Sequence, residues 1–319
     1  MKILVINSEF EQRHIDLIKD TAQKIKADVC FVNNEDEIGD DFKDAEVIYG
    51  FGLKTAAASK DLKWLCVPSA GVDYLLKPGV FANRDCIITN SAGAYGVSIA
   101  EHIIMVSLMM MRQMNVIYKS SIQGIWANKL PQRSLKDCRI TVLGTGDIGR
   151  NFAKRARAFD PKSIIGVNRS GRCNEGAFDR IAKIDELDNV LKESELLVMC
   201  LPDTDETKGI LSKERLALLP KGAYIVNVGR GSAIDEDALA DRLESKDLSG
   251  AALDVFASEP LPENSRLWKI DNLIITPHVA GNLTLRYTLD RNVEMFVEDL
   301  VNYAKNRPLK HQIDKNRGY

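Results

Sequence analysis

The chain has 319 residues, which is enough for two domains of ordinary size. Hydrophobic residues make up 45% of it and charged residues 28%, fractions typical of a soluble globular protein. The 43 Lys and Arg residues against 45 Asp and Glu residues leave a formal net charge of −2, so the charge indicates no nucleic-acid partner.

The sequence shows no targeting or membrane-spanning pattern. It begins directly with the apolar run KILVIN, without the charged and apolar regions of a signal peptide. The longest apolar run, Ile103–Met111, is about half of the ~20 residues that cross a bilayer. We therefore expect a cytoplasmic protein that makes no membrane contact.

The six cysteines include no CxxC pair, and most of them lie in apolar runs typical of strands. This pattern favours reduced, buried thiols and predicts no metal site. The cysteines are Cys30, Cys66, Cys86, Cys138, Cys173 and Cys200.

Short apolar runs alternate with helix-period segments along almost the whole chain, which predicts an α/β protein with parallel sheets. In the first hundred residues, a helical pattern at His14–Ile25 separates the first two of these runs. Strands are expected near Ile3–Asn7, Val29–Val32, Val47–Phe51, Trp64–Pro68 and Ile87–Asn90.

The next segment, SIAEHIIMVSLMMMRQMN, predicts a long helix. Ser98 and Glu101 match the S-x-x-E capping box, so the helix is expected to start at Ser98. We interpret Glu101 as the cap partner and His102 as a first-turn residue, not as catalytic groups. The methionines that follow favour a place in the core or at a subunit interface.

A second series of six apolar runs follows, and six is the number of strands in a full dinucleotide-binding sheet. The expected strands are Ile140–Gly144, Ile164–Val167, Leu196–Leu201, Tyr224–Val228, Ala251–Val255 and Leu273–Thr276.

Near the C-terminus, apolar residues recur at the spacing of one helix face, which could return the chain to the first domain. We predict two doubly wound parallel-sheet domains. Residues 1–98 and 288–319 would form a discontinuous, flavodoxin-like substrate domain, and residues 99–287 an inserted Rossmann dinucleotide-binding domain. The helix face consists of Val293, Phe296, Val297, Leu300 and Val301.

The stretch TVLGTGDIGRNF contains the motif G-x-G-x-x-G between an apolar strand and a helical pattern. Gly144 would allow the tight turn, Gly146 would let the backbone approach a pyrophosphate, and Gly149 would let the helix pack closely on the strand. Free N–H groups at the helix start would then bind the pyrophosphate. The context favours this interpretation over a glycine-rich turn without a ligand.

The end of the following strand predicts which dinucleotide binds. Asn168 lies 24 residues after Gly144, near the place where an acid would hold the ribose 2′-OH of NAD. Asn168 would not repel a 2′-phosphate, and Arg169, Ser170 and Arg172 could bind one. We therefore expect NADP(H) to be preferred over NAD(H). The alternative is that Arg169 stacks on adenine and that both cofactors work.

Polar residues follow three of the predicted strands, in NVGRGSAID, ALDVFASEP and TPHVAGN. Ligands of open α/β sheets bind beyond the carboxyl ends of strands, so these loops should face one crevice. Of the four histidines, only His278 follows a strand and precedes a glycine-containing turn, which favours it as the acid–base group. Glu259 could orient its imidazole, and Arg230 could clamp a carboxylate. Each also has a plain structural interpretation, as a paired loop arginine, a surface glutamate or a strand-end histidine.

Taken together, these segments resemble the D-isomer-specific 2-hydroxyacid dehydrogenase family, over nearly the whole chain. The matching stretches are SAGVDYL, GTGDIG, LPDTDETKGIL, NVGRGSAIDEDAL, ALDVFASEPLP and TPHVAGN. In that family, an arginine binds the carboxylate and carbonyl of a 2-keto acid, and a histidine supported by a glutamate transfers the proton. The resemblance gives these roles to Arg230, His278 and Glu259.

The resemblance also implies binding residues outside the catalytic set. Backbone N–H groups of Ala70 and Gly71 would bind the substrate carboxylate, together with Arg230 and His278. Asp254 would contact the nicotinamide amide. Further cofactor contacts are expected at Asp147, Ile148, Leu201, Pro202, Thr207, Val228 and Gly281.

The implied enzyme is an NADP-preferring reductase of small 2-keto acids, a homodimer through about residues 98–132, with NAD as a possible cofactor. Family members often carry Asp where Asn168 stands, which supports the preference for NADP. Trp126 is interpreted as an interface residue or, alternatively, as one that enters the partner's active site. Glu259 disfavours a formate dehydrogenase, which has Gln there, and we expect no regulatory domain after Tyr319.

Two alternatives remain. One is an NAD-dependent enzyme similar to phosphoglycerate dehydrogenase, for which Lys54 and Lys77 are the only evident extra cations. The other is a non-catalytic cofactor-sensing protein of the same fold.

Overall fold

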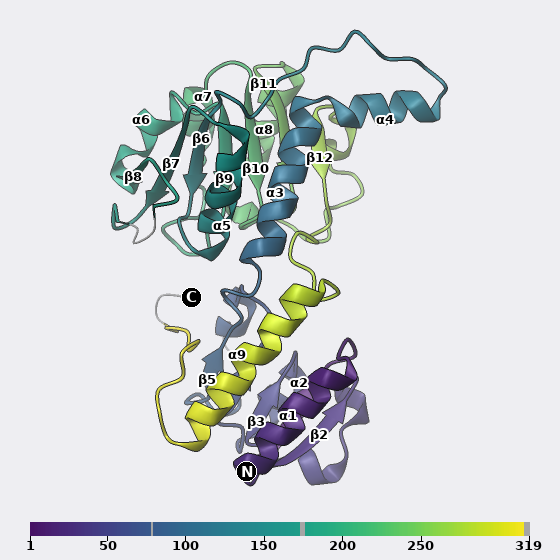
Figure 1. The fold of residues 1–319 in the computed structure, drawn as a ribbon, viewed down its shortest axis with the longest axis vertical. Coiled ribbons are helices and arrows are strands. Elements are labelled where there is room, and N and C mark those ends of the chain that lie inside the picture. The colour runs from purple at the N-terminus through teal and green to yellow at the C-terminus, as the bar shows by residue number, and fades with distance from the viewer. Residues whose placement is uncertain (78, 173–175, 316–319) are drawn as a thin grey trace. The chain divides into compact units, whose positions relative to one another are not determined.

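The structure is a computed structural model that describes residues 1–77, 79–172 and 176–315. The chain divides into two compact units, one of Met1–Tyr95 with Asn282–Tyr319 and one of Gly96–Gly281. Sequence patterns placed the domain boundaries after residues 98 and 287. We describe each unit by itself (Figure 1).

In the described residues of the first unit, parallel strands form one sheet in the order β2-β1-β3-β4-β5. This is the flavodoxin-like order of a doubly wound sheet, as the sequence predicted. The strands are β1 (Lys2–Ile6), β2 (Asp28–Val32), β3 (Val47–Tyr49), β4 (Trp64–Cys66) and β5 (Ile87–Thr89). The helices are α1 (Gln12–Lys24), α2 (Leu53–Ala58) and α9 (Arg286–Ala304), with 3₁₀ turns η1 (Glu35–Glu37), η2 (Asp40–Phe42) and η3 (Asp73–Leu76).

The sheet of the first unit is buried on both faces because successive side chains of a strand point to opposite sides. Leu4 packs into one core cluster, whereas Ile3 packs into the other, together with Ile18 of α1 and Phe296 of α9. Helices α1 and α9 lie side by side over this second face (Figure 1). The predicted apolar face of α9 therefore covers the sheet.

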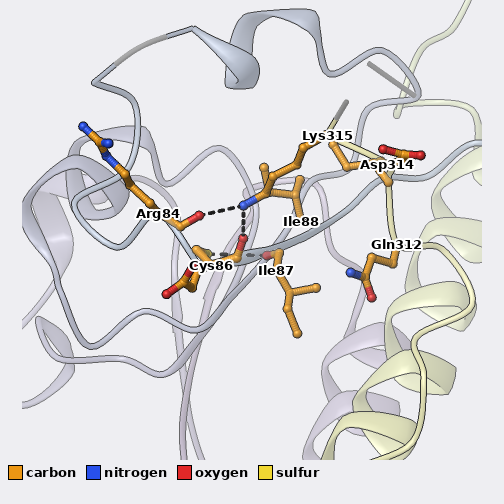
Figure 2. A pocket seen from close by; sticks show the side chains of 9 residues that line it. Arg84, Cys86, Ile87, Ile88, Gln312, Asp314 and Lys315 are labelled. Atoms are coloured by element: carbon orange, nitrogen blue, oxygen red, sulfur yellow. Dashed lines mark hydrogen bonds between the residues drawn. The ribbon is translucent and has the colours of Figure 1, made fainter. Parts of the chain in front are cut away.

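The chain after α9 returns to the free edge of β5. Ile313 N–H donates to the Ile88 carbonyl at 3.1 Å. Figure 2 shows Lys315, whose Nζ donates to the carbonyls of Arg84 at 2.9 Å and Cys86 at 2.7 Å. These residues line a surface cavity of about 630 Å³. The segment thus satisfies backbone groups that an edge strand would otherwise expose.

Asp299 holds the start of this segment from a buried position. Its carboxylate is 1% exposed and accepts the N–H groups of Lys310 at 2.7 Å and His311 at 3.1 Å, as well as His311 Nδ1 at 2.9 Å. Burial by itself would raise the pKa of this carboxyl, but the hydrogen bonds outweigh it and lower the pKa of Asp299.

We expect Asp299→Asn to lower the free energy of unfolding by about 2–4 kcal/mol, because a buried carboxylate with several donors is lost. The pKa of Asp299 is lower in the folded protein than in the unfolded chain. Its contribution to stability is therefore present at pH values above the unfolded-state pKa and is lost as the pH falls through the folded-state pKa. Urea unfolding at pH 7 and at acid pH measures both effects. Glu298→Gln, which removes only an exposed partner of Lys310, is the control; an equal loss in both variants would contradict the prediction.

In the described residues of the second unit, parallel strands form a sheet in the order β12-β11-β10-β9-β6-β7-β8. The chain runs outward from β6 to β8 and then returns to β9 beside β6, so the strand order reverses between β6 and β9. The strands are β6 (Arg139–Leu143), β7 (Ser163–Asn168), β8 (Arg180–Lys183), β9 (Leu196–Met199), β10 (Ala223–Asn227), β11 (Leu248–Leu253) and β12 (Leu273–Ile275).

Helices and 3₁₀ turns of the second unit connect these strands, and α3 packs against α5. The helices are α3 (Gly96–Met111), α4 (Met114–Ile122), α5 (Asp147–Ala156), α6 (Leu187–Leu191), α7 (Lys213–Leu218) and α8 (Glu236–Glu244). The 3₁₀ turns are η4 (Arg157–Phe159), η5 (Ile184–Glu186), η6 (Gly231–Ala233) and η7 (Arg266–Lys269). The fold class expected from sequence, two parallel-sheet α/β domains, is confirmed.

Two sequence expectations for this unit are wrong. The sheet has β8 in addition to the six predicted strands; this edge strand, RIAK, has only two apolar residues and so lacks a strong pattern. Helix α3 begins at Gly96, before Ser98, so Ser98 lies buried inside it and no capping box starts the helix. A Cβ on Gly96 would lie 2.3 Å from Asp147 Oδ2, so the first turn of α3 packs closely on α5.

The described cysteines are all free thiols, and Cys173 lies outside the described residues. Burial raises the pKa of the Cys66, Cys138 and Cys200 thiols to about 12. Within residues 1–77, 79–172 and 176–315, no group of His, Cys, Asp and Glu side chains could hold a metal ion. The helices described are too short or too polar to span a bilayer.

Candidate active site

The glycine-rich turn between β6 and α5 has little room for side chains. Gly144 has φ +95°, and a Cβ there would lie 2.7 Å from the Cys200 carbonyl oxygen. A Cβ on Gly149 would lie 2.1 Å from the Gly144 oxygen, whereas a Cβ on Gly146 would meet nothing within 4 Å. The turn is thus tight at Gly144 and Gly149 and open at Gly146, which fits the approach of a pyrophosphate.

The first turn of α5 keeps its acid away from that opening. Asp147 Oδ1 accepts Asn151 Nδ2 at 2.9 Å, and its buried Oδ2 lies against Gly96 of α3. The carboxylate therefore faces α3, while Ile148 follows it along the helix. The backbone N–H groups at the start of a helix are suited to an anion.

Asn168, at the end of β7, organises the turn that follows it. Its Nδ2 donates to Thr145 Oγ1 at 2.6 Å and to the Arg172 carbonyl at 2.8 Å, and its Oδ1 accepts Gly171 N–H at 2.7 Å and Ser170 Oγ at 3.2 Å. These four bonds engage both the amide nitrogen and the amide oxygen of the Asn168 side chain. Asn168 thereby ties the turn to the glycine-rich turn, a role that the sequence analysis missed.

The turn presents cations at its surface. Arg169 and Arg172 are exposed, and Arg169 Nη1 lies 3.6 Å from Glu206 Oε2, with both side chains more than half exposed. An exposed pair of this kind contributes about 0–1 kcal/mol and is easily replaced by a better anion. The sequence analysis did not identify Glu206.

The loop after β9 lies against the glycine-rich turn. A Cβ on Gly144 would lie 3.4 Å from Leu201 Cδ2. Thr207 Oγ1 donates to the Pro202 carbonyl at 2.6 Å and accepts Thr204 N–H at 3.0 Å, so this hydroxyl shapes the loop. Because β6 and β9 flank the reversal of strand order, these loops border the crevice in which doubly wound sheets bind ligands.

Arg230 lies between Gly229 and Gly231, and the absence of side chains at these two glycines lets three loops pack together. A Cβ on Gly229, just after Val228, would lie 2.6 Å from the Leu201 carbonyl oxygen, and one on Gly231 would lie 1.9 Å from the Phe256 carbonyl carbon. Asn227, buried at the end of β10, donates to the Arg230 carbonyl at 2.9 Å. The backbone of Arg230 is thus held between the loops after β9 and β11.

His278 and Glu259 form a direct pair. His278 Nδ1 lies 2.7 Å from Glu259 Oε2, and Glu259 Oε1 accepts Phe256 N–H at 2.9 Å. The imidazole is 52% exposed, so it is accessible while one nitrogen is engaged. Glu259 therefore fixes the orientation of the ring and leaves its other nitrogen accessible.

Asp254 shapes the turn on which His278 lies. Its carboxylate is 3% exposed and accepts Thr276 Oγ1 at 2.6 Å and the N–H groups of Val279 and Ala280, both at 2.9 Å. This turn places His278 at φ +54° and ends the unit at Gly281. The buried carboxylate thus fixes the backbone on both sides of His278.

The sequence analysis expected His102 in the first turn of its helix. Because α3 starts at Gly96, His102 lies beyond the first turn and behind the His278 turn. Its Nε2 lies 3.4 Å from Thr276 Oγ1, and burial lowers the pKa of its imidazole. Glu101 is exposed.

Ala70 and Gly71 belong to the first unit, on the loop after β4. Their carbonyl groups accept Asn90 Nδ2 at 2.7 Å and Ser69 Oγ at 2.9 Å respectively. These bonds orient the peptide groups of the loop.

The chain was compared with known proteins. The family model for the D-isomer specific 2-hydroxyacid dehydrogenase NAD-binding domain matches residues 104–280. The structure of a D-isomer specific 2-hydroxyacid dehydrogenase family protein from Aeromonas salmonicida is similar with a TM-score of 0.87 and 30% identity, over 98% of this chain and 99% of that one.

Two further relatives extend the comparison. A D-isomer specific 2-hydroxyacid dehydrogenase from Xanthobacter autotrophicus, solved in complex with NADPH and MES, has a TM-score of 0.79 and 28% identity, over 100% of this chain and 99% of that one. Glyoxylate/hydroxypyruvate reductase A from Salmonella choleraesuis is 28% identical over 267 residues, which are 82% of this chain and 83% of that protein. The chain therefore belongs to the D-isomer specific 2-hydroxyacid dehydrogenase family, a family of NAD(P)-dependent oxidoreductases.

Proposed function

We propose that the protein reduces small 2-keto acids to D-2-hydroxy acids and prefers NADP(H) as cofactor. The observation that carries the proposal is the 2.7 Å contact between His278 and Glu259. The cofactor preference rests on a separate turn, beyond β7, that holds two exposed arginines. The relatives named for reduction of glyoxylate and hydroxypyruvate, and for bound NADPH, support it.

The residues of the site divide the work of the reaction. The reduced nicotinamide, when bound, supplies the hydride. His278 carries the proton and gives it to the oxygen of the substrate carbonyl, and Glu259 stabilises the imidazolium before that transfer. Arg230 stabilises the negative charge that develops on the same oxygen and clamps the carboxylate. The N–H groups of Ala70 and Gly71 are assigned to the substrate carboxylate.

The cofactor would be held by the glycine-rich turn and the loops beside it. The open face at Gly146 would take the pyrophosphate. Arg169 and Arg172 would bind the 2′-phosphate, on a turn that Asn168 holds in place and to which Ser170 adds a hydroxyl. The loops after β9, β10 and β12 would line the nicotinamide half of the cofactor and would contact it through Leu201, Pro202, Thr207, Val228 and Gly281. Asp254 would lie near the nicotinamide amide.

We expect kcat/KM to be at least tenfold higher with NADPH than with NADH, which corresponds to about 1.4 kcal/mol. Arg169→Ala should remove most of this preference by lowering kcat/KM for NADPH alone, because NADH has no 2′-phosphate. Initial rates with glyoxylate, hydroxypyruvate and a branched 2-keto acid test both statements. An equal loss with both cofactors would instead assign Arg169 to the adenine, and equal use of both by the unaltered protein would refute the preference.

A phosphorylated substrate is the alternative. Of its two candidate cations, Lys54 pairs with Asp36 at 3.1 Å, and both side chains are exposed, so a phosphate could displace that acid.

We also propose that the protein is a homodimer through residues 98–132. This region carries apolar side chains at the surface of α3, α4 and the segment that follows, including a groove lined by Met105, Met109 and Ile117. Trp126, on that segment, is 88% exposed. An apolar surface of this kind is typical of a subunit interface. Its exposed members are Met105, Met114, Tyr118, Ile122, Ile125 and Trp126.

A further inference from the structure

The loop after β11 holds Glu259 at an exposed position. Val255 and Phe256 at its start are buried, whereas residues 257–260 are exposed. The buried part of this loop therefore ends at Phe256, three residues before Glu259. The position of its carboxylate depends on what holds the backbone at Phe256 and Ala257.

Three contacts hold the backbone of Phe256 and Ala257. Gly231 lies directly against it, since a Cβ there would be 2.3 Å from Ala257 N. Phe256 N–H donates to Glu259 itself. Ala257 N–H donates to Glu236 Oε1 at 2.7 Å, the only one of the three contacts made by a side chain from another element.

Glu236 is not needed as the cap of its own helix. Asp235 is the N-cap of α8, and its side chain accepts Ala238 N–H at 3.0 Å. Glu236 is half-buried, and burial, followed by the negative charges of Asp237 and Glu259, raises the pKa of its carboxyl. A carboxylate in such a place costs stability, which indicates that its contact with the loop has a purpose.

We propose that Glu236 is a positioning residue for the acid–base pair: it holds Ala257 N–H, and through that peptide it keeps Glu259 on His278. The proposal rests on the proposed function, in which His278 transfers the proton. Glu236 touches no reacting atom in this scheme and acts only through the loop.

Three variants test the proposal with NADPH and glyoxylate. Glu236→Ala removes both the acceptor and the charge, Glu236→Gln keeps an acceptor oxygen, and Asp237→Asn removes a charge from the same helical turn at an exposed position. We measure kcat, both KM values, and hydrogen exchange of the Ala257 amide.

The expected results separate geometry from charge. Glu236→Ala should lower kcat by about 10- to 100-fold through misplacement of the pair, leave the KM for NADPH unchanged and speed exchange at Ala257. Glu236→Gln should restore most of kcat and protect Ala257, because its amide oxygen can still accept the Ala257 N–H. Asp237→Asn should match the unaltered protein in kcat and exchange.

Two results would overturn the proposal: wild-type kcat and exchange in Glu236→Ala, or the same losses in Asp237→Asn, which would make the effect one of the helix terminus. Failure of the proposed function is distinguishable, because the protein would then reduce none of the 2-keto acids. Exchange at Ala257 would still report in that case whether Glu236 holds the loop.

Discussion

Replacement of His278 by Ala should lower kcat for reduction by about 10²- to 10⁴-fold, the range typical of a lost general acid. The imidazole is the group assigned to carry the proton, and its 2.7 Å contact with Glu259 holds one ring nitrogen, so the other is left for the substrate. The affinity for NADPH should stay within a few-fold of the original, because the pyrophosphate and 2′-phosphate sites assigned to the cofactor lie on other loops. Steady-state kinetics and fluorescence titration with NADPH measure the two quantities.

Glu259→Gln is the matched companion to this variant. It keeps an oxygen and an N–H group at the same place but removes the carboxylate that lies 2.7 Å from the ring. We expect kcat for reduction to fall in Glu259→Gln, with little change in the affinity for NADPH, because the ring that carries the proton loses its carboxylate partner. Unchanged turnover in His278→Ala would refute the mechanism and would favour the non-catalytic, cofactor-sensing alternative.

Gly231→Ala should be the most damaging single methyl group that can be added near the site. The new Cβ would lie 1.9 Å from the Phe256 carbonyl carbon and 2.3 Å from Ala257 N, and both are backbone atoms that cannot rotate away. Overpacking of this kind costs about 1–3 kcal/mol or more. The resulting shift of the Arg230 and Glu259 loops should lower kcat/KM by about 10²-fold or more. Thermal unfolding and initial rates measure both effects.

Gly39→Ala is the control for this prediction. A Cβ on Gly39 meets nothing within 4 Å, so that variant should keep its stability and activity. If Gly231→Ala behaved like Gly39→Ala, the loops after β10 and β11 would not be packed as the structure has them.

The same contact explains how residues from distant parts of the chain form one acid–base site. Gly231 brings the Arg230 loop against the loop that carries Glu259, and Asp254 fixes the turn of His278. None of these groups depends on a rigid helix. Each is held by a short loop beyond a buried strand, and the loops hold one another. Changes at Gly231, Asp254 or Glu236 should therefore act on the reaction without touching the substrate.

The sequence was sufficient wherever a local pattern carries the physical cause. Apolar runs gave nearly all the strands because a strand buried on both faces is apolar throughout. The edge strand β8 was not predicted, because it is short and half of its residues are polar. The glycine motif was recognised from its spacing between a strand and a helix. At Gly144 and Gly149 a side chain would collide with backbone atoms, whereas Gly146 is open. The family followed from such motifs.

The start of α3 shows where local patterns stop. Ser98 and Glu101 match a capping box, yet the helix begins at Gly96, which packs closely against Asp147 and Asn151 of α5. Sequence spacing carries no information about that partner. The same reason hid the role of Asn168, whose Nδ2 reaches Thr145 on another loop.

What the sequence alone determined, then, is the α/β class, the order of its elements, the family, and the residues Arg230, Glu259 and His278 as candidates. The contact of Glu259 with His278 that the sequence analysis expected is present at 2.7 Å. Tertiary structure alone decided that Asp254 and Glu236 hold the loops of that pair, and that Arg169 faces Glu206. The physical reason is that strands and glycine turns follow from periodicity and backbone freedom within a few residues. Hydrogen bonds and close packing between loops depend instead on which strands become neighbours in the sheet, and that order is set by the whole fold.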